Sequence, residues 1–132
     1  MVNTALPARF ADVEALEEFM SAPDPALAAH LEHAPGDILV LGVGGKMGPT
    51  LARMAKRAAP ARRVIGVARF SERGLREKLE AWGIECIECD LLDRAALERL
   101  PVAPNVLFMA GFLCKRHARS TVDKPTVTFK ES

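Results

Sequence analysis

The sequence predicts an α/β protein in which a parallel sheet carries helices on both faces. Four short apolar runs recur within residues 37–111, and segments with helical spacing separate them. Continuous apolar runs are typical of strands buried on both faces, and strand–helix–strand connections make the strands parallel. We expect the strand order 3-2-1-4, with the sheet incomplete beyond its fourth strand.

Each element has its own local signals. The expected strands are 37–43, 62–69, 84–90 and 105–111, and the helices between them are 48–59, 71–83 and 92–100. Ser71 is expected to cap the second of these helices and Gly83 to end it, while Asp93 caps the third. Two further short helices precede the sheet, at 11–20 and 23–33, with Asp12 and Asp24 as N-caps.

Composition divides the chain into three regions and excludes several protein classes. We expect a helical extension over residues 1–36, an α/β unit over 37–111, and a basic, disordered tail over 112–132. The net charge of the 132 residues is +1, which gives no general reason to expect binding to nucleic acid. No apolar run is long enough to span a membrane, and the N-terminus lacks the pattern of a secretory signal. These properties predict a cytoplasmic protein.

The cysteines and histidines give little reason to expect a metal site or a redox site. The three cysteines, Cys86, Cys89 and Cys114, do not form a disulfide framework. Cys86 and Cys89 form a C-x-x-C pair, but residues three apart in a strand point to opposite faces, so the two thiols diverge. His30 and His33 match no zinc spacing. We expect no metal.

A glycine-rich loop follows the first strand directly. It reads Gly-Val-Gly-Gly-Lys-Met-Gly and contains Gly42, Gly44, Gly45, Lys46, Met47 and Gly48. Gly42 permits a tight turn at the end of the strand, and Gly44 or Gly45 lets a pyrophosphate approach the backbone. Gly48 lets the following helix pack closely. The N-terminus of that helix offers free N–H groups to phosphate, and Lys46 adds a positive charge. The pattern predicts a dinucleotide site.

The second strand ends without the acidic residue that usually binds the ribose hydroxyls of NAD. Ala68 stands at the expected position, Arg69 follows it, and Ser71 is close by. An arginine would pair with a 2′-phosphate that a carboxylate would repel, so the sequence favours NADP over NAD. The alternative is that Arg69 is an exposed residue after a strand.

The ends of the third and fourth strands supply further candidates. Asp90 and Leu91 are expected to lie near the adenine, although Asp90 could equally begin the turn into the next helix. Ala110 and Gly111 end the fourth strand, where the backbone can approach the central part of a cofactor.

Together these motifs resemble the extended short-chain dehydrogenase/reductase superfamily, in particular its NAD-dependent epimerase/dehydratase group. The resemblance covers residues 37–111 and rests on the Gly-x-x-Gly-x-x-Gly loop, Arg69, Asp90 and the strand ending in Gly111. It implies a Rossmann-like fold and the hydride transfer of an oxidoreductase. It also implies that Gly42, Gly45 and Gly48 contact the pyrophosphate, Arg69 the adenosine phosphate, Asp90 and Leu91 the adenine, and Ala110 and Gly111 the nicotinamide-side ribose.

One part of the family pattern is missing. The resemblance implies a catalytic Tyr-x-x-x-Lys pair, but the sequence contains no tyrosine. We therefore expect a truncated, cofactor-binding half that is not catalytic alone, with no catalytic residue in it. A natural short form and a frameshift near Gly111 are both open explanations. The exposed fourth strand would favour self-association.

Two other functions remain as alternatives. The first is a non-catalytic NAD(P)-sensing or interaction module, which would need no tyrosine. The second is an S-adenosylmethionine-dependent methyltransferase, but such a site usually has acidic residues where Leu41 and Ala68 stand.

Overall fold

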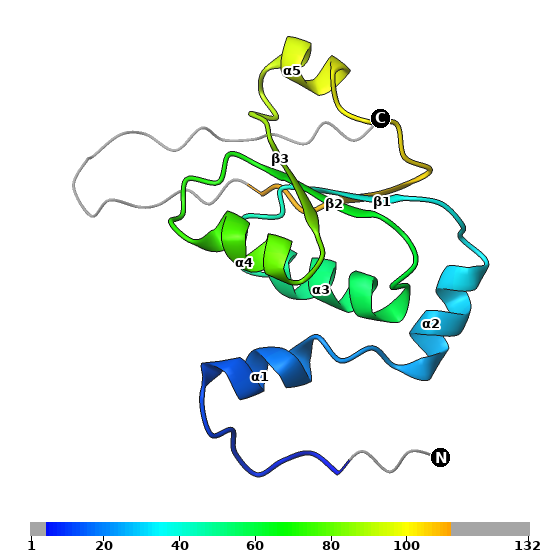
Figure 1. Ribbon diagram of the computed structural model, residues 1–132, viewed down its shortest axis with the longest axis vertical. Coiled ribbons are helices and arrows are strands. Elements are labelled where there is room, and N and C mark those ends of the chain that lie inside the picture. The colour runs from blue at the N-terminus through cyan, green and yellow to red at the C-terminus, as the bar shows by residue number, and fades with distance from the viewer. Residues whose placement is uncertain (1–4, 112–132) are drawn as a thin grey trace, which may run out of the picture.

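The computed structural model describes residues 5–111 of the chain, and within them it contains a four-stranded parallel sheet. Figure 1 shows this sheet with the helices around it. The strands are β1 (Ile38–Leu41), β2 (Val64–Ala68), β3 (Glu85–Glu88) and β4 (Asn105–Phe108). Their order is β3-β2-β1-β4, which is the predicted order 3-2-1-4. The predicted α/β class and the Rossmann-like topology are therefore confirmed. The expected tail, 112–132, lies outside the described residues.

Burial differs sharply across the sheet. Every residue of β2 is buried, and three of the four residues of β1 are buried. Ile38 pairs with Val64 on one side and with Asn105 on the other, so β1 lies at the centre of the sheet. The central strands are therefore the continuous apolar runs that sequence patterning singles out most clearly.

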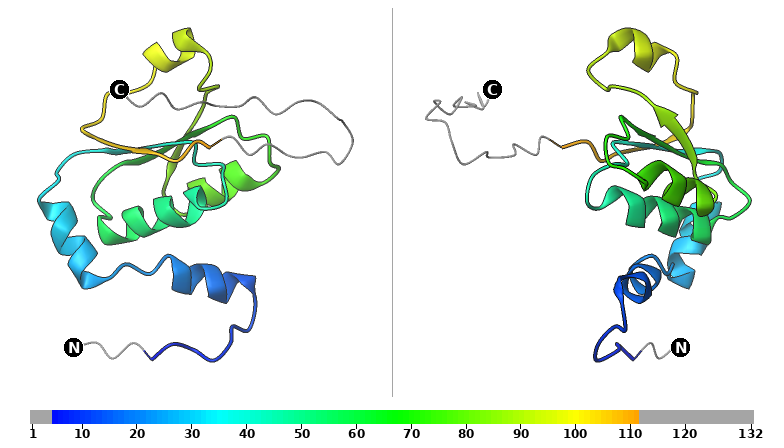
Figure 2. Two further views of the ribbon diagram at one scale, coloured as in Figure 1. Left: turned by 180° about the vertical axis from the view of Figure 1, so that it is seen from behind. Right: turned by 60° about the vertical axis from the view of Figure 1, so that its left-hand side comes forward.

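The connecting helices lie on both faces of the sheet. Helices α3 (Gly48–Ala58) and α4 (Leu75–Ala81) lie on one face, and the short helix α5 (Arg94–Glu98) lies on the other (Figure 2). Two apolar clusters follow from this arrangement: one includes side chains of α3 and α4, and the other includes side chains of α5. Cys86 packs against the first cluster and Cys89 belongs to the second, so the two thiols diverge as predicted.

The expected start of α4 is wrong. The helix begins at Leu75, its N-cap is Gly74, and no side chain caps it, so Ser71 is not its cap. Phe70 and Gly74 both have positive φ angles, 51° and 83°, and these bends keep residues 71–74 out of the helix. The expected end is correct: Gly83 has a φ of 83°, and Ile84 N donates to Leu79 O at 3.1 Å.

The predicted N-terminal helices are present, as α1 (Val13–Met20) and α2 (Pro25–Glu32). The Asp12 carboxylate accepts from Ala15 N, and the Asp24 carboxylate accepts from Ala26 N, each at 2.7 Å. Neither helix contains a buried residue. The spacing of Val13 and Leu16 correctly predicted a helix, but Val13 is 70% exposed, so these side chains do not face a core.

The two edges of the sheet differ in chemistry. The outer strand β3 carries Glu85 and Glu88, whereas β4 carries no charged residue. On β4, Val106 is 52% exposed and Phe108 is 69% exposed. Charged residues protect a sheet edge from unwanted pairing, so β4 is the less protected of the two edges. Within residues 5–111 no helix is both long and apolar enough to cross a membrane.

Candidate functional site

The glycine-rich loop joins β1 to α3 and lies against the end of β2. The amides of Gly42 and Val43 both donate to Val67 O, at 2.8 and 3.1 Å. Gly42 has a φ of +81°, a conformation that glycine adopts without strain. A Cβ at Gly42 would lie 2.5 Å from Ala110 N. The loop therefore turns tightly at the strand end because position 42 has no side chain.

Gly48 is the second position where a side chain would not fit. A Cβ there would overlap the backbone carbonyl group of Val43. Gly48 is also the first residue of α3, and it is buried. The start of α3 therefore packs directly onto the loop backbone, which places the N-terminus of the helix at the end of β1.

The middle of the loop is more open than its ends. A Cβ at Gly45 would meet nothing closer than Gly42 O at 3.7 Å, and one at Gly44 would lie 3.4 Å from the Ala68 Cβ. Within residues 5–111, the amides of Gly44, Lys46 and Gly48 donate to no protein acceptor. The loop thus presents a short run of backbone N–H donors, and Lys46 stands among them.

The N-terminus of α3 also lacks a side-chain cap. Its N-cap is Met47, which makes no capping hydrogen bond. By contrast, α1, α2 and α5 are each capped by an aspartate, and the Asp93 carboxylate of α5 accepts from Ala96 N at 3.2 Å. An uncapped helix N-terminus carries unsatisfied donors and a partial positive charge, which an anion can satisfy.

The ends of the other strands surround this loop. Gly44 lies beside Ala68 at the end of β2, and Cys89 N donates to Ala68 O at 2.9 Å, which brings the end of β3 alongside. At the other side, Met109 N donates to Leu41 O at 2.8 Å, so the residues that follow β4 reach Gly42. The candidates Arg69, Asp90 and Ala110 therefore follow three parallel strands whose carboxyl ends lie together at one end of the sheet.

The side chains at the carboxyl ends of the strands have different surroundings. Arg69 and Ser71 are exposed, and within the described residues Arg69 forms no ion pair. The Asp90 carboxylate accepts from Leu92 N at 2.9 Å, so Asp90 does begin the turn toward the next helix, which is its alternative role. Leu91 is partly buried against the cluster on the α5 face. In the part of the chain that the structure describes, a Cβ at Gly111 would meet nothing within 4 Å.

A cavity of about 440 Å3 lies beside the glycine loop. Lys46 of the glycine loop and Thr50 of α3 line it on one side. Arg73, in the loop before α4, Lys78, on α4, and Glu17, on α1, complete the charged part of the lining that the argument below uses. Of these residues, only Lys46 is a candidate from the sequence. Arg73 had a recognisable signal, because it stands in the segment after the second strand, but nothing in the sequence indicated that Glu17 approaches the loop.

Comparison with family models decides the classification. Residues 38–131 match the model described as the NAD dependent epimerase/dehydratase family. This chain belongs to that family. The match confirms the resemblance, and it continues past Gly111, where the region that carried the resemblance ends. No curated protein and no solved structure matches the chain.

Membership of the NAD-dependent epimerase/dehydratase family implies a nicotinamide dinucleotide cofactor. The residues at the carboxyl ends of the strands fit such a group: the backbone is open at Gly44 and Gly45, and α3 has an uncapped N-terminus. When bound, a nicotinamide supplies hydride transfer chemistry. The tyrosine of the family's catalytic pair has no counterpart in these 132 residues, which contain no tyrosine.

Proposed function

We propose that this chain binds a nicotinamide dinucleotide at the glycine loop and the carboxyl ends of the four strands, and that it prefers NADP to NAD. The observation that carries the proposal is the set of free backbone donors at Gly44, Lys46 and Gly48, next to an uncapped α3. Donors arranged at a helix N-terminus suit the two charges of a pyrophosphate.

The two ends of the cofactor follow from the order of the strands. The adenosine half lies toward β2 and β3, near Arg69, Asp90 and Leu91. The nicotinamide half lies toward β4, near Ala110 and Gly111. Asp90 uses one oxygen in its own turn, so its proposed part is to keep the β3 end in place beside the adenine. Leu91 presents an apolar side chain there.

The preference for NADP rests on charge. The end of β2 has no carboxylate at Ala68, and the exposed Arg69 follows it. Lys46 and Arg73 line the adjacent cavity, in which three cations outnumber two carboxylates. Guanidinium and ammonium groups bind a phosphate through charge-assisted hydrogen bonds, so these residues favour the cofactor that carries a 2′-phosphate.

The proposal is limited to binding. Without a tyrosine, these residues lack the acid/base group of Tyr-x-x-x-Lys, so the chain by itself is assigned no catalytic residue. The same observation favours a second candidate function, a module that senses NAD(P) or binds a partner in response to it.

The test is a set of parallel calorimetric titrations of the full chain with NADPH, NADH and S-adenosylmethionine. The proposal predicts saturable one-site binding of NADPH, weaker binding of NADH, and no binding of S-adenosylmethionine. Binding of S-adenosylmethionine alone would assign the loop to a different cofactor. Equal affinities for NADPH and NADH would contradict the preference while leaving the dinucleotide assignment intact.

A further inference from the structure

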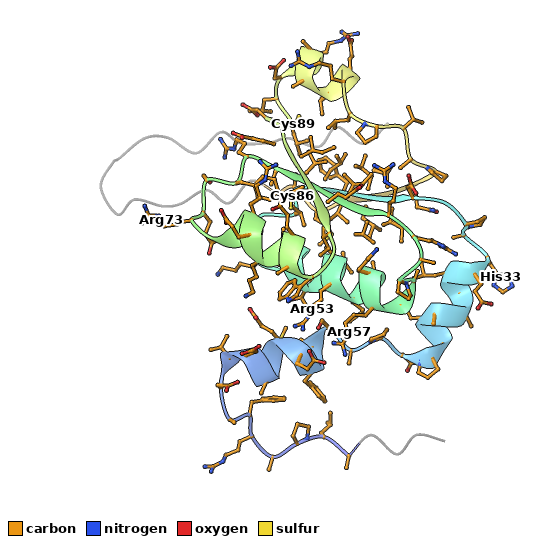
Figure 3. The ribbon with its side chains drawn as sticks, viewed as in Figure 1. His33, Arg53, Arg57, Arg73, Cys86 and Cys89 are labelled. Carbon is orange, nitrogen blue, oxygen red and sulfur yellow. The ribbon has the colours of Figure 1, made fainter. Side chains whose placement is uncertain are left out.

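Helix α1 is attached to the body of the protein through ion pairs. The Glu18 carboxylate pairs with Arg53 at 2.7 Å and with Arg57 at 2.9 Å, both on α3. The labelled side chains of Arg53 and Arg57 point toward α1 in Figure 3. Helix α1 contains no buried residue. Arg57 also donates to Glu18 O and to Ser21 Oγ, each at 2.9 Å. Polar contacts therefore hold α1, and competing anions weaken contacts of this kind.

A second ion pair brings α1 to the candidate cofactor site. The Glu17 carboxylate pairs with Lys78 Nζ at 2.5 Å. Both residues line the cavity beside the glycine loop, together with Lys46 and Arg73. The side chain of Glu17 is 29% exposed, which makes it the more enclosed member of the pair, since Lys78 is 42% exposed. A carboxylate from the N-terminal extension therefore lies in a cavity that three cations and one further carboxylate, Glu72, line.

The position of this cavity connects it to the adenosine half of the cofactor. It lies between the glycine loop, at Gly45, and the segment just after β2, at Arg73. The proposed function places the phosphate on the adenosine ribose at this same segment, which begins with Arg69. The Glu17 carboxylate and such a phosphate are both anions that suit Lys78, and the phosphate carries more charge and more acceptor oxygens.

We propose that Glu17 is an internal competitor for the adenosine 2′-phosphate, and that a cofactor carrying this phosphate takes Lys78 from Glu17 and loosens α1. This inference rests on the proposed function, because it concerns the same site. It assigns α1 a regulatory part: the helix lowers the affinity for the phosphorylated cofactor, and the bound cofactor in turn releases the helix. Binding and release are coupled in both directions, as linkage requires.

The experiment compares Glu17→Gln with Glu14→Gln in the full chain. Both substitutions remove one negative charge from α1, but within residues 5–111 Glu14 forms no ion pair and does not line the cavity. Titrations with NADPH and NADH at one ionic strength measure the affinities. Hydrogen exchange of the α1 amides, with and without each dinucleotide and with adenosine 2′-monophosphate, measures the release of the helix.

Glu17→Gln is expected to tighten NADPH binding about two- to fivefold, the range that removal of one surface ion pair allows, and to leave NADH binding unchanged. Glu14→Gln is expected to change neither affinity. In the wild-type chain, NADPH and adenosine 2′-monophosphate should speed exchange in α1, and NADH should not.

The failures of the two proposals are distinguishable. If the wild-type chain binds both dinucleotides, but Glu17→Gln behaves like Glu14→Gln and α1 exchange is unaffected by NADPH, this inference is wrong and the proposed function stands. If the wild-type chain binds neither dinucleotide, the proposed function is wrong, and the inference is wrong with it.

Discussion

The backbone of Ala110, just beyond β4, lies so close to Gly42 that a Cβ on Gly42 would come within 2.5 Å of the Ala110 amide nitrogen. This approach joins the ends of β1 and β4 at the candidate site. It also means that the position of the glycine loop depends on the packing of the last described strand. Substitutions at the glycines can therefore separate effects on folding from effects on binding.

Gly42→Ala should destabilise the fold. An alanine at a φ of +81° is strained, and its Cβ would force apart the backbones at Gly42 and Ala110. We expect a loss of about 2–5 kcal/mol in the free energy of unfolding, the sum of these two costs. Denaturant unfolding measures it. Gly111→Ala is the control, because among residues 5–111 its Cβ would meet nothing within 4 Å. Equal stability of the two variants would contradict the account.

Gly45→Ala should weaken cofactor binding without weakening the fold. Its Cβ has room within the protein, since its nearest neighbour is Gly42 O at 3.7 Å, but it would stand where the pyrophosphate must approach the loop. We expect the dissociation constant for NADPH to rise about tenfold or more. Titration gives the affinity, and a denaturation midpoint within error of the wild type shows that the loss is local. Unchanged affinity would mean that the loop does not contact the cofactor.

Arg69→Ala should reduce the preference for NADPH. Removal of the guanidinium should raise the dissociation constant for NADPH about tenfold and change that for NADH less than twofold, because NADH has no 2′-phosphate. Arg94→Ala is the matched control, because the Arg94 side chain is 92% exposed and pairs with Glu98. Both residues lie on α5, on the face of the sheet that α3 and α4 do not cover. If Arg69→Ala lowers both affinities equally, Arg69 does not read the phosphate.

The exposed β4 strand should make the chain associate with itself. Val106 and Phe108 present apolar surface on an edge without charged residues. We expect sedimentation velocity to show association that grows with protein concentration, and the double variant Val106→Thr, Phe108→Ser to reduce it. A wild-type chain that remains a single monomeric species over the whole concentration range would show that this edge is not adhesive.

The stability of the chain should fall at alkaline pH partly through Cys86. Burial raises the pKa of the Cys86 thiol above its ordinary value, and the charges of Glu80 and Glu77 raise it further, while Arg76 opposes them. Because the folded-state pKa is raised, the stabilisation is present below the unfolded-state pKa and is lost as the pH rises through the folded-state pKa. We expect Cys86→Ala to lose less stability than the wild type above about pH 8.5. Parallel pH dependences would rule out this contribution.

The sequence predicted the fold well because each element carries strong local signals. The buried runs Ile38–Leu41 and Val64–Ala68 are typical of central strands, and the aspartate caps identified three helix starts. The start of α4 was missed because it depends on the positive φ angles of Phe70 and Gly74, which sequence patterning does not reveal for a phenylalanine.

The candidate site was predictable only in part. The glycine loop and the ends of the strands follow from local pattern and strand order, so the proximity of Gly42 and Ala110 was predictable from the chain alone. The contact between Glu17 and Lys78 was not, because it joins residues 61 positions apart through the docking of α1. The spacing of apolar residues on α1 predicted the helix but not the face that contacts the rest of the protein, because the acidic residues of α1 make those contacts.

The central claim is that the backbone N–H groups of the glycine loop bind a dinucleotide pyrophosphate. It is tested most directly by mapping amide chemical shifts in the isotope-labelled chain as NADPH is added. The account predicts that the largest shifts occur at Gly44, Gly45, Lys46 and Gly48, and that they saturate together. Saturating shifts confined to other residues, or no shifts at millimolar NADPH, would contradict it.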